Sequence, residues 1–190
     1  MAEEKKLQSY LQAGETVRWE GETAQFPLLE KTYSRRIWVQ WIASTVVCGG
    51  LLFWYLSSDV VKETGIIVLL GVVLATLLLS PVWERYCLVK QRYWMTNRRI
   101  IVMSWDQTLY SMPLEDVDAY RVIRDQSSTP CLVLGSHRFE DIAKQLRWRA
   151  CHPKEDVQRA STVDGMILYA VKNVDEAVSF LKADAIGKTA

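Results

Sequence analysis

The fold is decided by two apolar stretches, IWVQWIASTVVCGGLLFWYL at residues 37–56 and GIIVLLGVVLATLLLSPVW at residues 65–83. Neither contains a charged residue. Each is about as long as a helix that crosses roughly 30 Å of hydrocarbon at about 1.5 Å per residue. Only eight residues, 57–64, separate the two stretches. The sequence therefore predicts a transmembrane α-helical hairpin, which ties the polar remainder of the chain to a bilayer.

A cleaved signal peptide and a pair of soluble core helices are the alternatives to this hairpin. The first stretch follows a mixed-charge segment and is longer than the apolar region of a signal peptide. Soluble core helices rarely run this far without a charge. Aromatic residues also gather near the ends of the stretches, at the level that indole and phenol rings prefer in a membrane. They are Trp38, Trp41, Trp54, Tyr55, Trp83 and Tyr86.

Basic residues flank the outer ends of the hairpin and predict its orientation. They are Lys31, Arg35, Arg36, Arg85, Lys90, Arg92, Arg98 and Arg99, whereas the connecting loop carries one lysine against Asp59 and Glu63. Because positive residues stay on the cytoplasmic side, both termini are expected in the cytoplasm of a two-span cell-membrane protein. The net charge of the whole chain is only +1, and no segment has the basic excess of a nucleic-acid binder.

Small residues and one proline are expected to shape the hairpin. Gly49, Gly50 and Gly71 leave room for close helix approach. Pro81 is expected to kink or end the second helix.

The polar part of the chain, residues 84–190, reads as a cytoplasmic α+β domain behind a short N-terminal segment, residues 1–36, with one short strand. Alternating and β-branched residues predict antiparallel strands with turns between them. These strands cover residues 93–96, 100–105, 108–112, 117–124, 131–134 and 165–171. A closing helix is expected after Asn173, with Glu176 as its capping-box partner. Residues 152–164 read as a loop. We expect Ile100, Val102, Leu132 and Leu168 to be core residues.

Three short motifs stand out outside the two apolar stretches: LQAGETVRWEG at residues 11–21, YWMTNRRII at residues 93–101 and MPLEDV at residues 112–117. They resemble motifs of bacterial pleckstrin-homology-like membrane proteins of the YdbS/YdbT type. The resemblance covers about residues 10–135 and 164–184, and residues 136–163 depart from it as an insertion. It implies a pleckstrin-homology-like domain, an antiparallel β-barrel or sandwich closed by a C-terminal helix. From the residues themselves, Thr96 to Arg99 supply turn chemistry, with Asn97 tolerating the left-handed region, so fold maintenance is their expected role.

No catalytic, cofactor-binding or metal-binding residues are predicted. The sequence has no Gly-rich phosphate loop, no HExxH and no GxSxG. Cys151 and His152 are adjacent but lack a second ligand pair, and the four cysteines contain no CxxC, as expected in a reducing compartment. Ionisable residues are absent from the spans, which argues against a proton relay or transporter.

Two functions from different classes remain open. The first is a non-catalytic membrane-anchored binding or scaffold module that acts through a protein partner or homo-oligomer. The second is a module that senses anionic membrane lipids, each basic residue near the surface being worth about 1 kcal/mol. The candidate membrane-interface residues are Arg35, Arg36, Trp38, Trp83, Arg85, Lys90 and Arg92. Topology determination alone also accounts for the basic residues.

The insertion contains a predicted amphipathic helix at residues 138–149. Its apolar stripe and a terminal tryptophan give the candidate partner-surface residues Phe139, Ile142, Leu146 and Trp148. A basic helix with an aromatic edge suits a membrane surface or a partner. The alternative is that the stripe covers an open end of the sheet.

Overall fold

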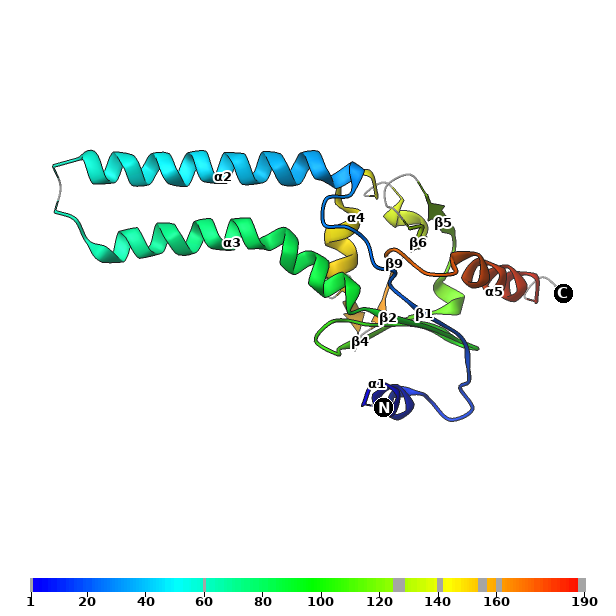
Figure 1. Ribbon diagram of the computed structural model, residues 1–190. Coiled ribbons are helices and arrows are strands. Elements are labelled where there is room, and N and C mark those ends of the chain that lie inside the picture. Colours follow the sequence, from blue (N-terminus) through cyan, green and yellow to red (C-terminus); the bar gives the residue numbers. More distant parts are fainter. Residues whose placement is uncertain are drawn as a thin grey trace. The chain divides into compact units, whose positions relative to one another are not determined.

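The structure, a computed structural model, describes residues 2–59, 61–124, 129–139, 142–153, 157–159 and 162–187 (Figure 1). The chain divides into two compact units. The hairpin unit spans Pro27–Arg85, and the sheet unit combines Met1–Phe26 with Tyr86–Ala190. Most of the N-terminal segment therefore belongs to the sheet unit.

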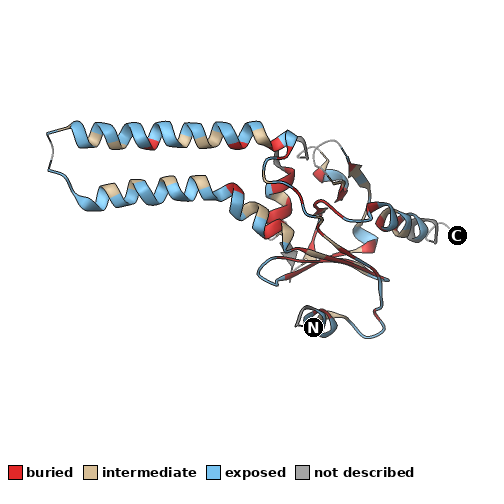
Figure 2. Cartoon of the chain, in the orientation of Figure 1, coloured by how far each residue is buried: buried red, intermediate tan, exposed pale blue. Residues whose placement is uncertain are grey.

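Two long helices make up most of the hairpin unit. α2 spans Lys31–Ser57 and α3 spans Thr64–Val89, and both are long and apolar enough to cross a membrane. Within their most apolar windows, only 17% of α2 and 6% of α3 is buried, and most residues of both helices are exposed or partly exposed (Figure 2). The predicted pair of apolar helices is confirmed. Their limits are wider than the apolar stretches, because polar residues at both outer ends continue the helices.

Pro81 lies inside α3 and does not end it. A proline has no N–H, so the carbonyl of Leu77, four residues earlier, loses its helical donor. Gln40 Nε2 donates to this carbonyl at 3.0 Å, and Ser80 Oγ donates to it at 3.2 Å. Trp41 Nε1 donates to the neighbouring carbonyl of Leu78 at 3.0 Å. Side chains of both helices thus satisfy the backbone at the proline, an arrangement that a helix crossing a bilayer would need.

Replacing Gln40 by leucine is expected to loosen the hairpin by about 0.6 to 1.7 kcal/mol, the usual range for an interhelical hydrogen bond in a membrane. The measurement is the mole fraction of SDS at which α2 and α3 of the reconstituted chain separate. Separation is followed by fluorescence energy transfer between one dye on α2 and one on α3. Thr76→Val is the control, because the hydroxyl of Thr76 donates to the carbonyl of Val72 on its own helix. Equal effects of the two substitutions would contradict the role assigned to Gln40.

The glycines of the spans do not mark a contact within this hairpin. A Cβ built on Gly49, Gly50 or Gly71 meets no atom within 4 Å. The expectation that they allow close approach of α2 and α3 is therefore wrong. Hydrogen bonds around Pro81 join the two helices instead.

Among its described residues, the sheet unit contains two sheets and five helical segments besides the last turn of α3. Its strands are β1 (Val17–Glu22), β2 (Arg92–Thr96), β3 (Arg99–Met103), β4 (Leu109–Pro113), β5 (Tyr120–Ile123), β6 (Cys131–Leu134), β7 (Val157–Arg159), β8 (Thr162–Val163) and β9 (Met166–Leu168). Its helices are α1 (Ala2–Tyr10), η1 (Leu114–Asp116), η2 (Ser136–Arg138), α4 (Ile142–Cys151) and α5 (Val174–Gly187).

The strands pair in the orders β1-β2-β3-β4-β8-β7 and β5-β6-β9. Among the described residues, every strand pairing is antiparallel except that of β4 with β8, which is parallel at Ser111 and Thr162. Over the described residues the two sheets do not close into a barrel. The predicted α+β class with mainly antiparallel strands is confirmed, whereas a closed barrel is not observed.

The main core lies between the two sheets and α5. Ile100, Val102, Leu132 and Leu168 belong to it and are at most 2% exposed, so their predicted burial is confirmed. The alternation along β3 also holds, because Ile101 and Met103 lie in a separate cluster on the other face. A third cluster joins the end of α3 to α4 and β6.

Several predicted boundaries differ from the structure. Part of the expected loop at residues 152–164 forms β7 and β8, whose few residues give too short a pattern to recognise. α4 begins at Ile142 rather than at residue 138, where η2 ends instead. Asn173 precedes α5 with φ 55°, and its backbone carbonyl accepts from the N–H of Glu176. α1 was not expected, because its sequence is almost entirely polar.

Candidate functional site

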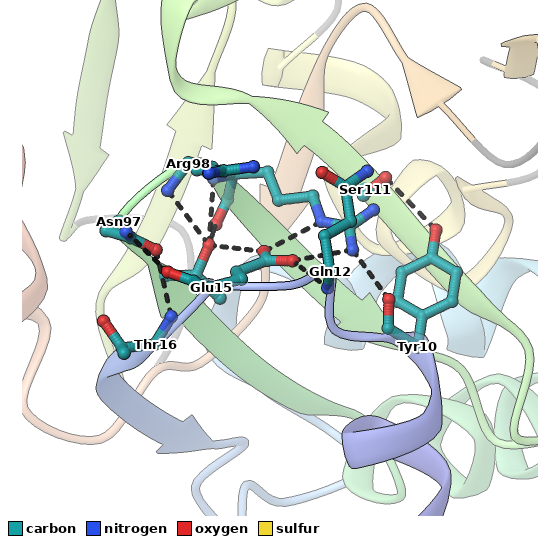
Figure 3. Close-up of polar contacts among 10 residues, drawn as sticks. Tyr10, Gln12, Glu15, Thr16, Asn97, Arg98 and Ser111 are labelled. Carbon is teal, nitrogen blue, oxygen red and sulfur yellow. Dashed lines mark hydrogen bonds and ion pairs between the residues drawn. The ribbon is translucent and has the colours of Figure 1, made fainter.

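The motifs at residues 11–21 and 93–101 meet in space at the edge of the six-stranded sheet, and the third motif adjoins them, because Pro113 lies opposite Arg99. β1 pairs antiparallel with β2, and Val17 lies opposite Thr96. This register brings the segment before β1 next to the β2–β3 turn. Figure 3 shows the polar contacts that join the two segments. We call the group formed by Glu15, Thr96, Asn97 and Arg99 the junction.

Glu15 is the centre of the junction, and its side chain is fully buried. Arg99 donates to both carboxylate oxygens, from Nε and from the terminal nitrogen, each at 2.9 Å. Thr96 Oγ1 donates at 2.7 Å, and the backbone N–H of Gln12 donates at 2.8 Å. A buried carboxylate is tolerated only with such partners, and the bidentate arginine supplies the opposite charge.

Asn97 and Thr96 fix the turn that presents Arg99. Asn97 Oδ1 accepts from the N–H of Thr16 at 3.0 Å, and its own N–H donates to the carbonyl of Thr16 at 3.1 Å. Thr96 Oγ1 accepts from the N–H groups of Arg98 and Arg99. Asn97 is not among the residues with positive φ. Its side chain clamps the N-terminal segment rather than adopting the predicted left-handed conformation.

Arg99 also ties α1 to the sheet. Its terminal nitrogen donates to the carbonyl of Tyr10 at 2.8 Å, and its guanidinium lies 4.5 Å from the centre of the Tyr10 ring. The Tyr10 hydroxyl lies 3.2 Å from Ser111 Oγ on β4. One arginine thus joins α1, the segment after it and β3.

Protonation of Glu15 is expected to destabilise the sheet unit. Burial raises the pKa of this carboxyl, but hydrogen bonds from Arg99, Gln12 and Thr96 and the charge of Arg99 outweigh it, so the net pKa is lowered. The unfolded chain then binds the proton more tightly than the folded one. The stability that ionised Glu15 contributes to the folded state is complete above the ordinary pKa of about 4.3. It is lost as the pH falls through the lower pKa of the folded state.

The measurement is the free energy of unfolding of the full chain in detergent between pH 7 and pH 3. Wild type is expected to lose stability more steeply with falling pH than Glu15→Gln. Glu20→Gln, a carboxylate exposed on β1, is the charge-matched control. Equal slopes for wild type and Glu15→Gln would contradict a lowered pKa at Glu15.

Tyr93 is the centre of a second buried polar group. Its hydroxyl lies 2.9 Å from Thr23 Oγ1, and the N–H of Tyr169 donates to it at 3.1 Å. Gln91 Oε1 lies 3.0 Å away, and Gln91 Nε2 donates to the carbonyl of Ala150 at 2.6 Å. Burial raises the pKa of Tyr93 far above its ordinary value, so the hydroxyl stays neutral. The group joins β2 to the chain after β9 and to α4.

Asp118 organises the end of the small sheet. It accepts from the N–H of Ala119 at 2.7 Å and from both the N–H and the hydroxyl of Ser136. These hydrogen bonds from Ser136 lower the pKa of Asp118. The contacts fix the position of Ser136, the first residue of η2.

The predicted membrane-interface residues divide between the two units. Arg35, Arg36, Trp38, Trp83 and Arg85 belong to the hairpin unit, where both tryptophans are at least half exposed. The other two, Lys90 and Arg92, belong to the sheet unit.

Lys90 and Arg92 both have partners within the sheet unit. The Lys90 ammonium lies 5.8 Å from the ring centre of Tyr86. Arg92 pairs with Glu22, which also binds Lys172. Arg92 is therefore partly neutralised.

The predicted partner surface on the inserted helix is only partly exposed. Leu146 is fully buried in the cluster with Cys87 and Leu88, so its assignment to a surface is wrong. Phe139 packs against the same cluster. Trp148 is 37% exposed and lies beside His152, with 4.9 Å between ring centres. The side chain of Ile142 lies outside the described residues. Phe139 and Leu146, the described residues of the stripe, therefore pack on this cluster and cover it.

Sequence reasoning missed Glu15 and Tyr10 as partners of Arg99. The signal was the joint occurrence of the motifs at residues 11–21 and 93–101, each of which carries one charge of the pair.

Among the described residues, no three His, Cys, Asp or Glu side chains gather as a metal site would require. No protein-family model, curated protein or solved structure matches this chain.

Proposed function

We propose that this chain is a non-catalytic, membrane-anchored scaffold or binding module of the bacterial cytoplasmic membrane. In this proposal the hairpin spans the bilayer, both termini are cytoplasmic and the sheet unit is a pleckstrin-homology-like domain. The domain acts by binding another protein or a second copy of the chain.

One contrast within the chain carries the proposal. The two long helices expose their apolar side chains, as helices surrounded by lipid do. The sheet unit instead uses its buried polar groups internally, at Glu15 with Arg99, at Tyr93 and at the turn made by Asp118. Polar groups that are hydrogen-bonded to one another inside the unit hold its strands and helices in place. Such a rigid arrangement suits a binding module.

The topology is tested by thiol labelling of Ser58→Cys in intact cells. Ser58 lies in the connection between α2 and α3, and the four native cysteines are buried. A membrane-impermeant maleimide is expected to label this site from outside, and a cysteine added at the C-terminus only after lysis. The reverse pattern would overturn the orientation.

Association is tested by native mass spectrometry of the full chain released from membranes in mild detergent. A discrete complex with a second copy or another protein is expected. A chain that is monomeric throughout a titration to high concentration would refute the scaffold proposal.

Sensing of anionic lipid is the second candidate, and one contact favours it. Gln91 lies just after the end of the apolar helix α3, and its Nε2 donates to the carbonyl of Ala150 at 2.6 Å. α4, which carries exposed Trp148, is thereby fixed to the segment that directly follows α3. If lipid is the ligand, changing the anionic lipid content of nanodiscs should alter the fluorescence of a probe at Trp148→Cys but not at Ser179→Cys.

A further inference from the structure

The outer face of the six-stranded sheet carries an apolar patch that lies apart from the main core. Trp94 of β2, Ile101 and Met103 of β3, and Leu109 of β4 form it. Their neighbours in sequence, such as Ile100 and Val102, point to the opposite face and the main core. All four patch residues are at most 7% exposed, so another element must cover them.

The cover is the N-terminal helix α1. Leu7 is buried against the patch, and Tyr10 and Leu11 pack beside it. In Figure 1, α1 lies on the side of the sheet opposite β9 and α5. These three residues are the ones that pack on the patch among the described parts of the chain. When α1 leaves, the patch becomes an exposed apolar surface, which we call the seat.

α1 depends on the seat for its helical structure. It has nine residues, and isolated helices shorter than about 12 residues are marginal in water. Three apolar side chains, Leu7, Tyr10 and Leu11, pack on the patch, and Arg99 and Ser111 add polar contacts to Tyr10. We expect a terminal helix held by so few groups to open before the rest of the domain. The Glu15–Arg99 pair and the pairing of β1 with β2 over Val17–Glu22 lie beyond α1 in the chain and do not include it. We therefore expect release of α1 to expose the seat while the sheet stays assembled.

We propose that the seat is a self-association site, which α1 of a second copy occupies in an exchanged dimer. The inference rests on the proposed membrane scaffold, because two copies anchored by the same hairpin share one orientation and a raised local concentration. α1 is the segment that the structure shows to fit the seat. In the exchanged dimer, α1 makes the same contacts with the partner's seat that it otherwise makes with its own. Exchange is therefore a low-cost route to a dimer.

The test uses two tagged full-length copies, one carrying Gln8→Cys and the other Glu20→Cys, co-expressed in one membrane. Gln8 is exposed on α1, and Glu20 lies opposite Trp94 in the sheet register. A chain with both cysteines calibrates the shortest bis-maleimide that links them within one copy. With that reagent, a crosslinked heterodimer is expected, and the native cysteines are buried and give little background.

Leu7→Asp added to the copy that carries Gln8→Cys is expected to lower the heterodimer yield at least tenfold. Ser9→Asp, a charge placed on an exposed position of α1, is the matched control and should leave the yield unchanged. No heterodimer, or one that survives Leu7→Asp, would overturn the proposal. Alkaline washing of the same membranes reports on anchoring separately: a chain that washes out refutes the proposed function, whatever the crosslinking shows.

Discussion

Replacing Arg99 by alanine is expected to destabilise the sheet unit by about 3 to 5 kcal/mol, the usual cost of removing one partner from a buried ion pair. The substitution leaves Glu15 charged and fully buried, with only Thr96 and Gln12 as donors. It also removes the hydrogen bond to Tyr10. The measurement is the free energy of unfolding of the full chain in detergent, followed by tryptophan fluorescence in a urea titration.

Arg98→Ala is the matched control. Arg98 is the adjacent arginine of the same turn and is exposed, so its loss should change stability by less than about 0.5 kcal/mol. The double substitution Glu15→Leu with Arg99→Leu should cost less than the sum of the two single substitutions, because no buried charge is left without a partner. A small effect of Arg99→Ala, or strict additivity in the double variant, would show that the pair is not coupled as the structure indicates.

Replacing Leu132 by alanine is expected to cost about 2 to 5 kcal/mol in the same measurement. Leu132 is fully buried at the centre of the small sheet, opposite Val122 on β5 and Leu168 on β9. Its loss opens a cavity between the two sheets, in a core that they share with α5.

Val17→Ala is the control for the core substitution. Val17 is also a strand residue, but it is 38% exposed, so we expect a change below about 1 kcal/mol. Similar losses for the two variants would place Leu132 outside a tightly packed core.

Hydrophobic pattern correctly predicted the two long apolar helices and most strands. The uncharged stretches gave α2 and α3, and alternation along residues 100–103 assigned each side chain of β3 to its face. These features are local, because a side chain's face follows from the period of its own element. The pattern failed where an element is short or polar, as in α1 and β8.

The inserted helix shows where a local pattern becomes ambiguous. Its spacing predicted an amphipathic helix, and α4 is one, but the same spacing fits a core lid and a contact surface equally. Leu146 is buried because Cys87 and Leu88 at the end of α3 pack on it. Which of the two roles applied depended on residues more than fifty positions away, and periodicity carries no information about them.

The sequence by itself determined two apolar helices of membrane-spanning length, a polar α+β region after them and the core face of its central strands. Only the tertiary structure decided that residues 1–26 complete that region, that Glu15 pairs with Arg99 and that α1 covers the outer sheet face. The physical reason is distance along the chain. A run of apolar residues carries its burial preference within itself, whereas an ion pair across 84 positions exists only once strand pairing has brought its two ends together.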